Sequence, residues 1–215
     1  MVIRDWSSDV CSSDLNCYLY YDEASKLGVI IDPGAEEHAI VKAVEKAGFR
    51  PLAILLTHGH ADHIAAVAPL MDRYNIPLYA GKGEEALLAD PSLNMSAFVG
   101  APLTAPTPDT LLNDNELVQV GPIELRVLTT PGHSPGGICY LDERAAILFC
   151  GDTLFWGSVG RTDFPGCSHE QLIDSINRQL LPLPPSVICY PGHGPTTTIG
   201  GEKRNNPFLS GSHFV

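Results

Sequence analysis

The chain lacks any uninterrupted apolar run of about 18 residues, the length that a membrane-spanning helix needs, and its amino terminus lacks a basic region followed by a hydrophobic stretch. Basic residues are also few: 13 Lys and Arg stand against 25 Asp and Glu, a formal net charge of -12. Proteins that bind nucleic acids concentrate Lys and Arg against the phosphates. We therefore expect a soluble, cytoplasmic protein that binds neither membranes nor nucleic acid; its oligomeric state stays unknown from the sequence.

Cysteine pairs are missing as well. The six cysteines form no C-x-x-C pair and follow no secretory signal: Cys11, Cys17, Cys139, Cys150, Cys167 and Cys189. This spacing supports neither a disulfide framework nor a structural zinc site built on cysteine. Because several of these cysteines lie within apolar runs, where a thiol packs as a small hydrophobic side chain, we expect free thiols.

With 215 residues, 44% of them hydrophobic, the chain is long enough for one domain with a substantial core. Seven short runs rich in β-branched and aromatic residues are typical of strands: NCYLYY, LGVIID, LAILLT, IELRVLTT, GICYL, AAILFC and SVICYP. Helical periodicity occurs over Glu36–Ala47, after His63, where Pro69 should begin or kink the helix, and from Ser168 onward. The Pro-rich segment Asp90–Asp114 is predicted to be a long covering loop. The pattern predicts an α/β fold.

The stretch THGHADH carries the strongest chemical signal. It follows an apolar strand and contains His58, His60, Asp62 and His63. Imidazole and carboxylate groups are the ligands that hold divalent cations such as zinc. Four ligands this close in sequence cannot easily all reach one ion. We therefore expect His58 and His60 to serve one metal, and Asp62 and His63 to serve a second metal beside it.

Three further apolar runs end in the same way, at His133 in TTPGH, Asp152 in FCGD and His193 in YPGH. In layered α/β structures, sites assemble at the carboxyl ends of strands. Seven ligands from four strand ends fit a dinuclear site with three histidines on one ion, an acid and two histidines on the other, and Asp152 as a bridge. Three histidines stand outside this pattern and are expected to have no ligand role: His38, His169 and His213.

In this order and at these intervals, THGHADH, PGH, GD and PGH resemble the metallo-β-lactamase superfamily. GDTLFWGSVGRTDFPG and YPGHGPTTTIGGEKRNNPFL are most similar to bacterial glyoxalase II-like (hydroxyacylglutathione hydrolase-like) enzymes, and the resemblance covers about Asn16 to Leu209. It implies an αββα four-layer sandwich. It also implies one metal on His58, His60 and His133, a second on Asp62, His63 and His193, and Asp152 shared between them. Zinc is the expected metal, with iron or manganese as alternatives.

The resemblance and the ligand set predict a metal-dependent hydrolase in which a bridging hydroxide attacks an acyl carbon. The expected substrate is a small-molecule acyl thioester such as S-lactoylglutathione, because a thiolate leaving group needs little protonation. Asp62, which also orients the nucleophile, and Asp152 are the expected catalytic residues. Arg161 in SVGRTD stands where glyoxalase II carries a basic residue that meets the carboxylate of glutathione; a structural pair with a nearby Asp is the alternative.

Two features depart from glyoxalase II. Gly194 and Pro195 replace the tyrosine that follows its last histidine, and the C-terminal helical domain that completes the glutathione pocket is not present. One alternative is a persulfide dioxygenase, which THGHADH and GRTDF also resemble and which would hold a single iron on His58, His133 and Asp152. The other alternative is a non-catalytic metal-binding module, which the presence of all seven ligands disfavours.

The stretch DWSSDVCSSDL, from Asp5 to Leu15, has no strand alternation, apolar face or ligand. Read backwards into codons, it resembles a translated short-read sequencing adapter. We therefore expect residues 1–15 to be a non-native segment in front of a single hydrolase domain at residues 16–215. Since the superfamily normally begins with an additional strand at this point, we expect that first strand to be missing or replaced.

Overall fold

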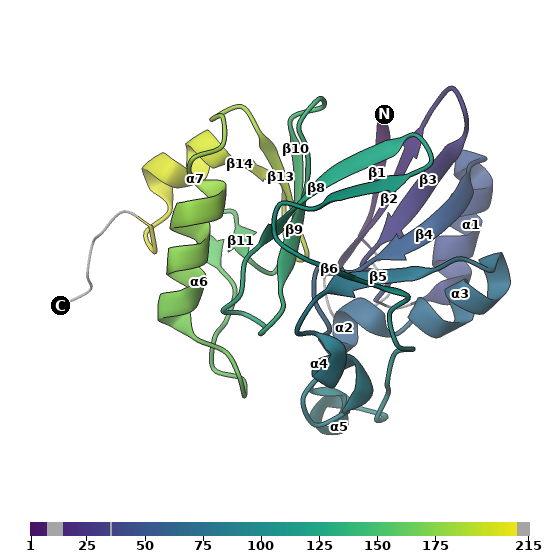
Figure 1. The fold of residues 1–215 in the computed structure, drawn as a ribbon, viewed down its shortest axis with the longest axis horizontal. Helices are drawn as coiled ribbons and strands as arrows, with labels where there is room; N and C mark the ends of the chain where they lie inside the picture. Colours follow the sequence, from purple (N-terminus) through teal and green to yellow (C-terminus); the bar gives the residue numbers. More distant parts are fainter. Residues whose placement is uncertain (8–14, 35, 210–215) are drawn as a thin grey trace.

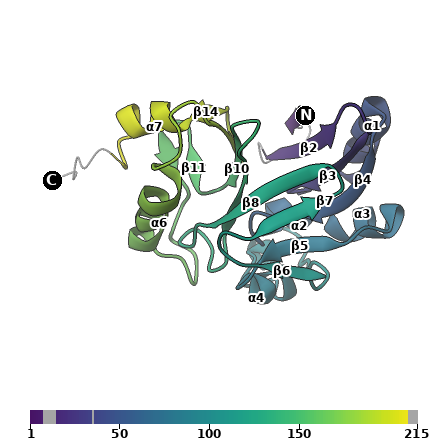
Figure 2. The same ribbon diagram turned by 45° about the horizontal axis from the view of Figure 1, so that its top comes forward.

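Two six-stranded β-sheets lie face to face, and helices cover the outer face of each sheet (Figure 1, Figure 2). The computed structural model describes residues 1–7, 15–34 and 36–209. The first sheet runs in chain order: β1 (Val2–Ser7), β2 (Asn16–Asp22), β3 (Leu27–Ile31), β4 (Arg50–Leu55), β5 (Leu78–Gly81) and β6 (Thr110–Leu112). In the second sheet the order is β14 (Thr197–Thr198), β13 (Ile188–Pro191), β10 (Ile147–Gly151), β9 (Ile138–Asp142), β8 (Ile123–Thr129) and β7 (Leu117–Val120).

The helices form the two outer layers of the fold, and short helices also lie within the loops at one edge of the sheets. They are α1 (Glu37–Ala47), α2 (Ala61–Ile64), α3 (Val67–Tyr74), α4 (Glu85–Ala89), α5 (Ser96–Val99), α6 (His169–Ser175), which continues as a π-helix (Ile176–Leu180), and α7 (Ile199–Asn205). A separate hairpin consists of β11 (Leu154–Phe155) and β12 (Ser158–Val159). This arrangement is the αββα four-layer sandwich that the family resemblance implies.

Three buried apolar clusters hold the four layers together. The first joins the first sheet to α1 and α3, the second joins the two sheets, and the third joins the second sheet to α6 and the π-helix. In β4, Ile54 belongs to the first cluster and Leu55 to the second; in β10, Phe149 belongs to the second and Leu148 to the third. Successive side chains of a strand point to opposite faces, so both sheets are buried on both sides and their strands read as continuous apolar runs.

Helices form at all three predicted places; the first begins and ends, and the third begins, close to the expected residues. Gly48, with φ of 66°, ends α1 in the left-handed conformation, and the side chain of Ser168 accepts a hydrogen bond from the backbone N–H of Gln171 at 3.3 Å to begin α6. The segment after His63 divides into α2 and α3. Pro69 lies in the first turn of α3, where the missing N–H breaks no helical hydrogen bond.

The prediction of one long loop over Asp90–Asp114 is wrong in part. The segment contains α5, and its end forms β6, which pairs in parallel with β5 at the edge of the first sheet. A three-residue edge strand bounded by Pro and Asp carries too little periodicity to be recognised from sequence. In the rest of the segment, Leu103 and Ala105 pack against the buried cluster of the first sheet.

The edge of the first sheet that precedes β2 holds a strand. β1 pairs antiparallel with β2, with Val2 opposite Tyr21 and Ser7 opposite Asn16. Of the two expectations, a missing strand is therefore wrong, whereas a replaced strand stays a prediction: pairing at a sheet edge uses backbone N–H and C=O groups and needs no side-chain alternation. Residues 8–14 lie outside the described residues. The non-native origin of residues 1–15 and the domain boundary stay predictions.

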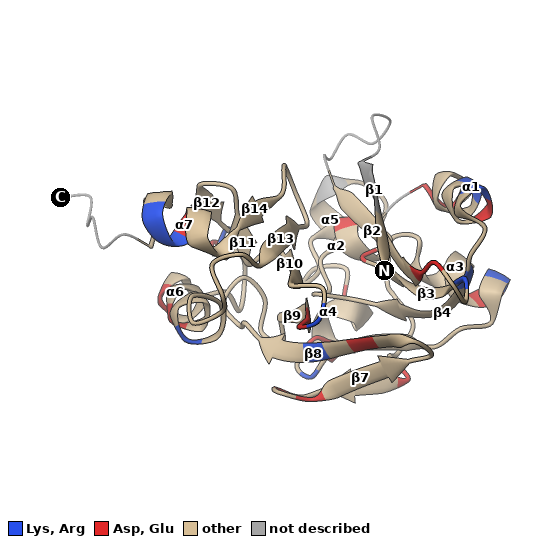
Figure 3. Ribbon diagram, turned by 90° about the horizontal axis from the view of Figure 1, so that it is seen from above, with Lys and Arg blue, Asp and Glu red and all other residues tan. Residues whose placement is uncertain are grey.

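Positions of basic and acidic residues are interspersed along the helices and strands in the ribbon of Figure 3. None of the five described cysteines forms a disulfide: Cys17, Cys139, Cys150, Cys167 and Cys189. Over the residues that the structure describes, no helix combines the length and the apolar character needed to cross a bilayer.

Candidate metal centre

Four strands deliver the predicted ligands to one edge of the sandwich. His58 and His60 follow β4 of the first sheet, whereas His133, Asp152 and His193 follow β8, β10 and β13 of the second sheet. β8 and β10 are both antiparallel to β9, and β10 is parallel to β13, so the carboxyl ends of these three strands share one edge. Asp62 and His63, in α2, complete the group of seven. The site thus lies where the two sheets meet.

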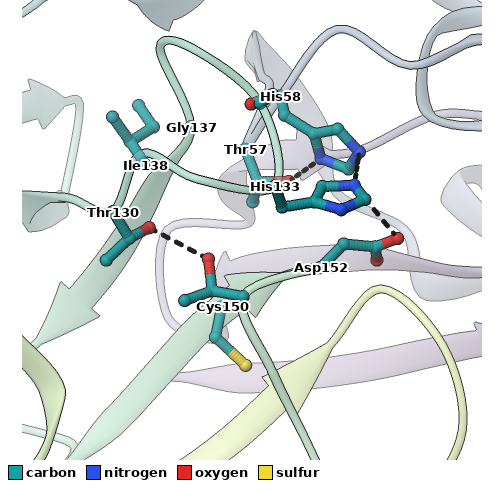
Figure 4. A pocket seen from close by; sticks show the side chains of 10 residues that line it. Thr57, His58, Thr130, His133, Gly137, Ile138, Cys150 and Asp152 are labelled. Atoms are coloured by element: carbon teal, nitrogen blue, oxygen red, sulfur yellow. Dashed lines mark hydrogen bonds and ion pairs between the residues drawn. The ribbon is translucent and has the colours of Figure 1, made fainter. Parts of the chain in front are cut away.

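Three histidines form the first group. The Nε2 atom of His133 lies 2.9 Å from Nδ1 of His60 and 3.2 Å from Nε2 of His58. All three side chains are buried. Figure 4 shows His58 and His133 pointing toward one another, with Asp152 directed at the same point. Three imidazole nitrogens therefore converge on one small space.

Asp62, His63 and His193 form the second group, and their ligand atoms lie within 4.8 Å of one another. Nε2 of His193 lies 3.1 Å from Oδ2 of Asp62. Asp152 stands between the two groups: its carboxylate oxygens lie 3.5 Å from Nε2 of His63, 3.6 Å from Nε2 of His133 and 3.7 Å from Nε2 of His193. This is the position that a carboxylate shared by two cations requires.

A hydrogen bond outside the cluster orients the imidazole of His133 so that its other ring nitrogen faces the cluster. Nδ1 of His133 donates to the backbone carbonyl of Arg161 at 2.7 Å, so that its Nε2 carries a lone pair toward the other histidines. Within the described residues, Nε2 of His63 and Oδ1 of Asp152 are buried without a hydrogen-bond partner. Converging lone pairs and buried polar atoms without hydrogen-bond partners are costly without a cation. The His and Asp cluster is therefore compatible with a dinuclear metal site.

The protonation states divide the cluster in two. Burial lowers the pKa of His60 to about 3, with His133 and His63 adding to the shift, and burial also lowers the pKa of His58 and His133. For His63 and His193 burial acts in the same direction, but the carboxylates outweigh it and raise the pKa of both. The three-histidine group is thus neutral at pH 7, which suits metal binding.

The two carboxylates of the cluster stay ionised. Burial opposes the charge of Asp62 most strongly, but His63 and His193 together outweigh burial and lower its pKa below the ordinary value. The pKa of Asp152 is lowered in the same way, with burial opposed chiefly by His63. Two anionic carboxylates among five imidazoles form a donor set that attracts divalent cations.

The comparison with protein families agrees with this geometry. A family model described as the metallo-beta-lactamase superfamily matches residues 14–193. The chain belongs to this superfamily. The match begins just before β2 and ends at His193, the last of the seven residues in the cluster.

Curated relatives of this superfamily member extend over most of its length. The probable metallo-hydrolase YqgX of Bacillus subtilis (strain 168) is 43% identical over 85% of this chain and 87% of the relative. The hydroxyacylglutathione hydrolase GloC of Haemophilus influenzae is 37% identical over 91% of this chain and 92% of the relative. The chain is a metallo-hydrolase of the superfamily by these similarities.

Solved structures share the same fold. The crystal structure of BLEG-1 B3 metallo-beta-lactamase is 41% identical, with a TM-score of 0.93 over 98% of this chain and 100% of that chain. The di-iron-bound form of TTHA1623 is 40% identical, with a TM-score of 0.85 over 95% and 100%. ETHE1 from Myxococcus xanthus is 31% identical, with a TM-score of 0.80 over 99% and 86%.

Sequence reasoning missed Asp32, a buried residue that supports the cluster from outside. Its carboxylate accepts hydrogen bonds from the backbone N–H of Thr57 at 2.8 Å and from the Thr57 hydroxyl at 2.7 Å, and it faces Nδ1 of His63 at 3.2 Å. The signal in the sequence is the run LGVIID, since Asp32 follows β3 as Asp152 follows β10. No other ligand type stands beside it in the chain, so the pattern did not single it out.

Arg161 forms an ion pair with a nearby Asp, which was one of the two alternatives for this residue. Its Nε and Nη2 atoms each donate to the carboxylate of Asp163 at 2.7 Å, and the guanidinium lies over the ring of Phe164 at 4.1 Å. Phe164 in turn contacts His60 edge to face, with 5.3 Å between ring centroids. The exposed Arg161 side chain thus belongs to a segment that lies beside the three-histidine group. His38 and His169 are exposed, and His213 lies outside the described residues.

Proposed function

We propose that this superfamily member is a dinuclear-metal hydrolase that cleaves small-molecule acyl thioesters such as S-lactoylglutathione. The observation that carries the proposal is the pair of ligand groups that share Asp152. When bound, two divalent cations would supply an acidified water and polarise the acyl carbonyl. His58, His60 and His133 would hold one ion, and Asp62, His63 and His193 would hold the other.

One side of the ligand cluster is exposed to solvent, and the other side is buried. Asp62 and His193 have the most exposed side chains of the cluster, at 37% and 28%, whereas His63 is fully buried. A substrate therefore approaches along Asp62 and His193. Asp62 accepts a hydrogen bond from His193 and stays anionic, which suits it to orient an attacking water. Asp152, held between the two groups, would fix their separation.

The thioester assignment is supported by the relative named hydroxyacylglutathione hydrolase and by the chemistry of the leaving group. A thiolate departs without a dedicated general acid. The substrate role of Arg161 belongs to the same proposal: a carboxylate on the thiol part of the substrate would compete with Asp163 for the guanidinium.

The first alternative is a persulfide dioxygenase, favoured by the similarity to the ETHE1 structure. It would need only His58, His133 and Asp152 around one iron. A β-lactam is a further acyl substrate to test, because another solved structure of high identity carries the name of a B3 metallo-beta-lactamase.

The deciding experiment measures turnover by protein reconstituted with zinc, iron or manganese. S-lactoylglutathione and other thioesters are tested by thiol release, a β-lactam by ring opening, and glutathione persulfide in an oxygen electrode. We expect thiol release that His60→Ala abolishes and His38→Ala, an exposed control on α1, leaves unchanged. Oxygen uptake without thiol release, or equal rates for His60→Ala and the unchanged protein, would overturn the proposal. Metal analysis of the active sample identifies the ion, which we expect to be zinc.

A further inference from the structure

A buried carboxylate outside the cluster connects the two loops that carry the three histidines. Glu84, immediately before α4, is 0% exposed. Its Oε2 accepts a hydrogen bond from the backbone N–H of Gly59 at 2.6 Å, and its Oε1 accepts one from the backbone N–H of Gly136 at 2.6 Å. Gly59 lies between His58 and His60, and Gly136 lies three residues after His133.

These two loops belong to different sheets. The loop of Gly59 follows β4 of the first sheet, and the loop of Gly136 connects β8 to β9 of the second. The two oxygens of one carboxylate are held at a fixed separation by covalent geometry. Because each carboxylate oxygen accepts a hydrogen bond from one of the two loops, Glu84 sets the distance between the His58–His60 segment and His133.

Both partners of Glu84 are glycines for a steric reason. A Cβ atom on Gly136 would lie 2.7 Å from the backbone nitrogen of Glu84, and one on Gly59 would lie 3.1 Å from Glu84 Oε2. Side chains there would push the carboxylate away from the N–H groups. The close approach of the two loops to Glu84 thus depends on glycine at two positions, Gly59 and Gly136.

We propose that Glu84 is a positioning residue that fixes the spacing of His58 and His60 against His133 and thereby the affinity of the three-histidine metal position. The inference rests on the proposed function for the existence of that position. Groups that orient metal ligands without touching the metal typically change affinity about 10- to 100-fold when removed. Glu84 is unusual among such groups because it holds backbone N–H groups of both ligand loops rather than a single imidazole.

The test titrates metal-free protein with zinc in competition with a chromophoric chelator and measures thermal unfolding of the same samples. Glu84→Gln keeps the shape of the side chain. Its amide NH2 group is a donor and cannot accept a hydrogen bond from a backbone N–H, so one of the two loops loses its hydrogen bond. We expect one of the two zinc ions to bind about 10- to 100-fold more weakly in Glu84→Gln, and at least as weakly in Glu84→Ala. Glu85→Gln, an exposed neighbour whose carboxylate accepts from the N–H of Gly83 at 2.6 Å, serves as the matched control and should bind as the unchanged protein does.

Leu180→Ala separates a positioning role from a general loss of stability. Leu180 is buried in the cluster between the second sheet and the π-helix, so its truncation should lower the melting temperature without changing zinc affinity. Zinc affinity unchanged in both Glu84 variants overturns the inference, and so does an equal loss of affinity in Leu180→Ala. Should Glu84→Ala fail to fold, Glu84→Gln decides. If the unchanged protein binds none of zinc, iron and manganese, the proposed function fails instead.

Discussion

Nδ1 of His63 lies 3.2 Å from Oδ2 of Asp32, and both side chains are buried. Asp32 is held in place by the N–H and hydroxyl of Thr57, the residue that precedes His58. A carboxylate on Nδ1 favours the tautomer that leaves Nε2 free to bind, and this nitrogen points toward Asp152. One carboxylate therefore orients both the start of the ligand segment and an imidazole of the second group.

Asp32→Ala should weaken zinc at the Asp62, His63 and His193 position by about 10- to 100-fold. It should also cost about 1–3 kcal/mol of unfolding free energy, because Thr57 loses its buried acceptor. Zinc competition and urea unfolding measure the two effects. Asp72→Ala, at an exposed position of α3, is the control. An Asp32→Ala protein with unaltered zinc affinity would show that the contact with His63 has no orienting role.

Acidification should release the two ions at different pH values. Metal binding requires a deprotonated imidazole. The pKa values of His63 and His193 are raised in the metal-free protein, so protons compete with metal there already near neutral pH, whereas burial keeps His60 neutral down to about pH 3. We expect the Asp62, His63 and His193 position to lose its ion in mild acid and the three-histidine position to lose its ion at lower pH. Metal analysis after dialysis over a pH series tests this, and a single step that releases both ions contradicts it.

Gly192→Ala should disturb the centre directly. A Cβ atom at Gly192 would collide with Oδ1 of Asp152 and lie 2.6 Å from Cε1 of His63. Because Asp152 stands between the two groups, a displacement of about 1 Å should lower turnover about 100-fold. In the described part of the chain, a Cβ atom on Gly100 would meet no atom within 4 Å, so Gly100→Ala is the control for steady-state kinetics. Equal turnover in both variants would argue against the collision.

Glu202→Ala should loosen the β11–β12 hairpin that follows Asp152. Glu202 is buried in α7, and its carboxylate accepts from the N–H of Gly157 at 2.9 Å and from the Asn206 side chain at 2.8 Å. We expect a loss of about 1–3 kcal/mol in urea unfolding, since these donors lose their partner. Lys203→Ala, exposed on the same helix, should change stability by less than about 0.5 kcal/mol. The prediction fails if the two variants are equally stable.

Arg161→Ala and Asp163→Ala should act in opposite directions on KM. Both side chains are exposed, so losing their ion pair should change the stability of the protein little. If a substrate carboxylate uses Arg161, removing Asp163 frees the guanidinium and lowers KM, whereas removing Arg161 raises it. Kinetics on a thioester with and without that carboxylate measure the effect. A KM unchanged in both variants would leave Arg161 with only its structural pair.

Many of the strands and helix ends of this protein can be predicted from its sequence. The apolar runs predict the strands that become β2, β3, β4, β8, β9, β10 and β13, because strands buried on both faces are apolar throughout. The capping residues Gly48 and Ser168 mark helix ends through local backbone geometry alone. The other strands of the two sheets were not predicted: β1, β5, β6, β7 and β14. β1 and β6 form by backbone pairing with a neighbouring strand and have no apolar periodicity of their own. No local pattern in the sequence therefore predicts them.

The sequence by itself determined which residues have metal-binding chemistry, because the ligand types and their place after apolar strands are properties of the chain. Only the tertiary structure decided their distances and the groups that support them. The sheets bring His58 to 3.2 Å from His133 across 75 positions of sequence, and they place Glu84 and Asp32 behind the ligands. Such contacts depend on how the two sheets pack, and that packing is set by the whole core rather than by the residues at the site.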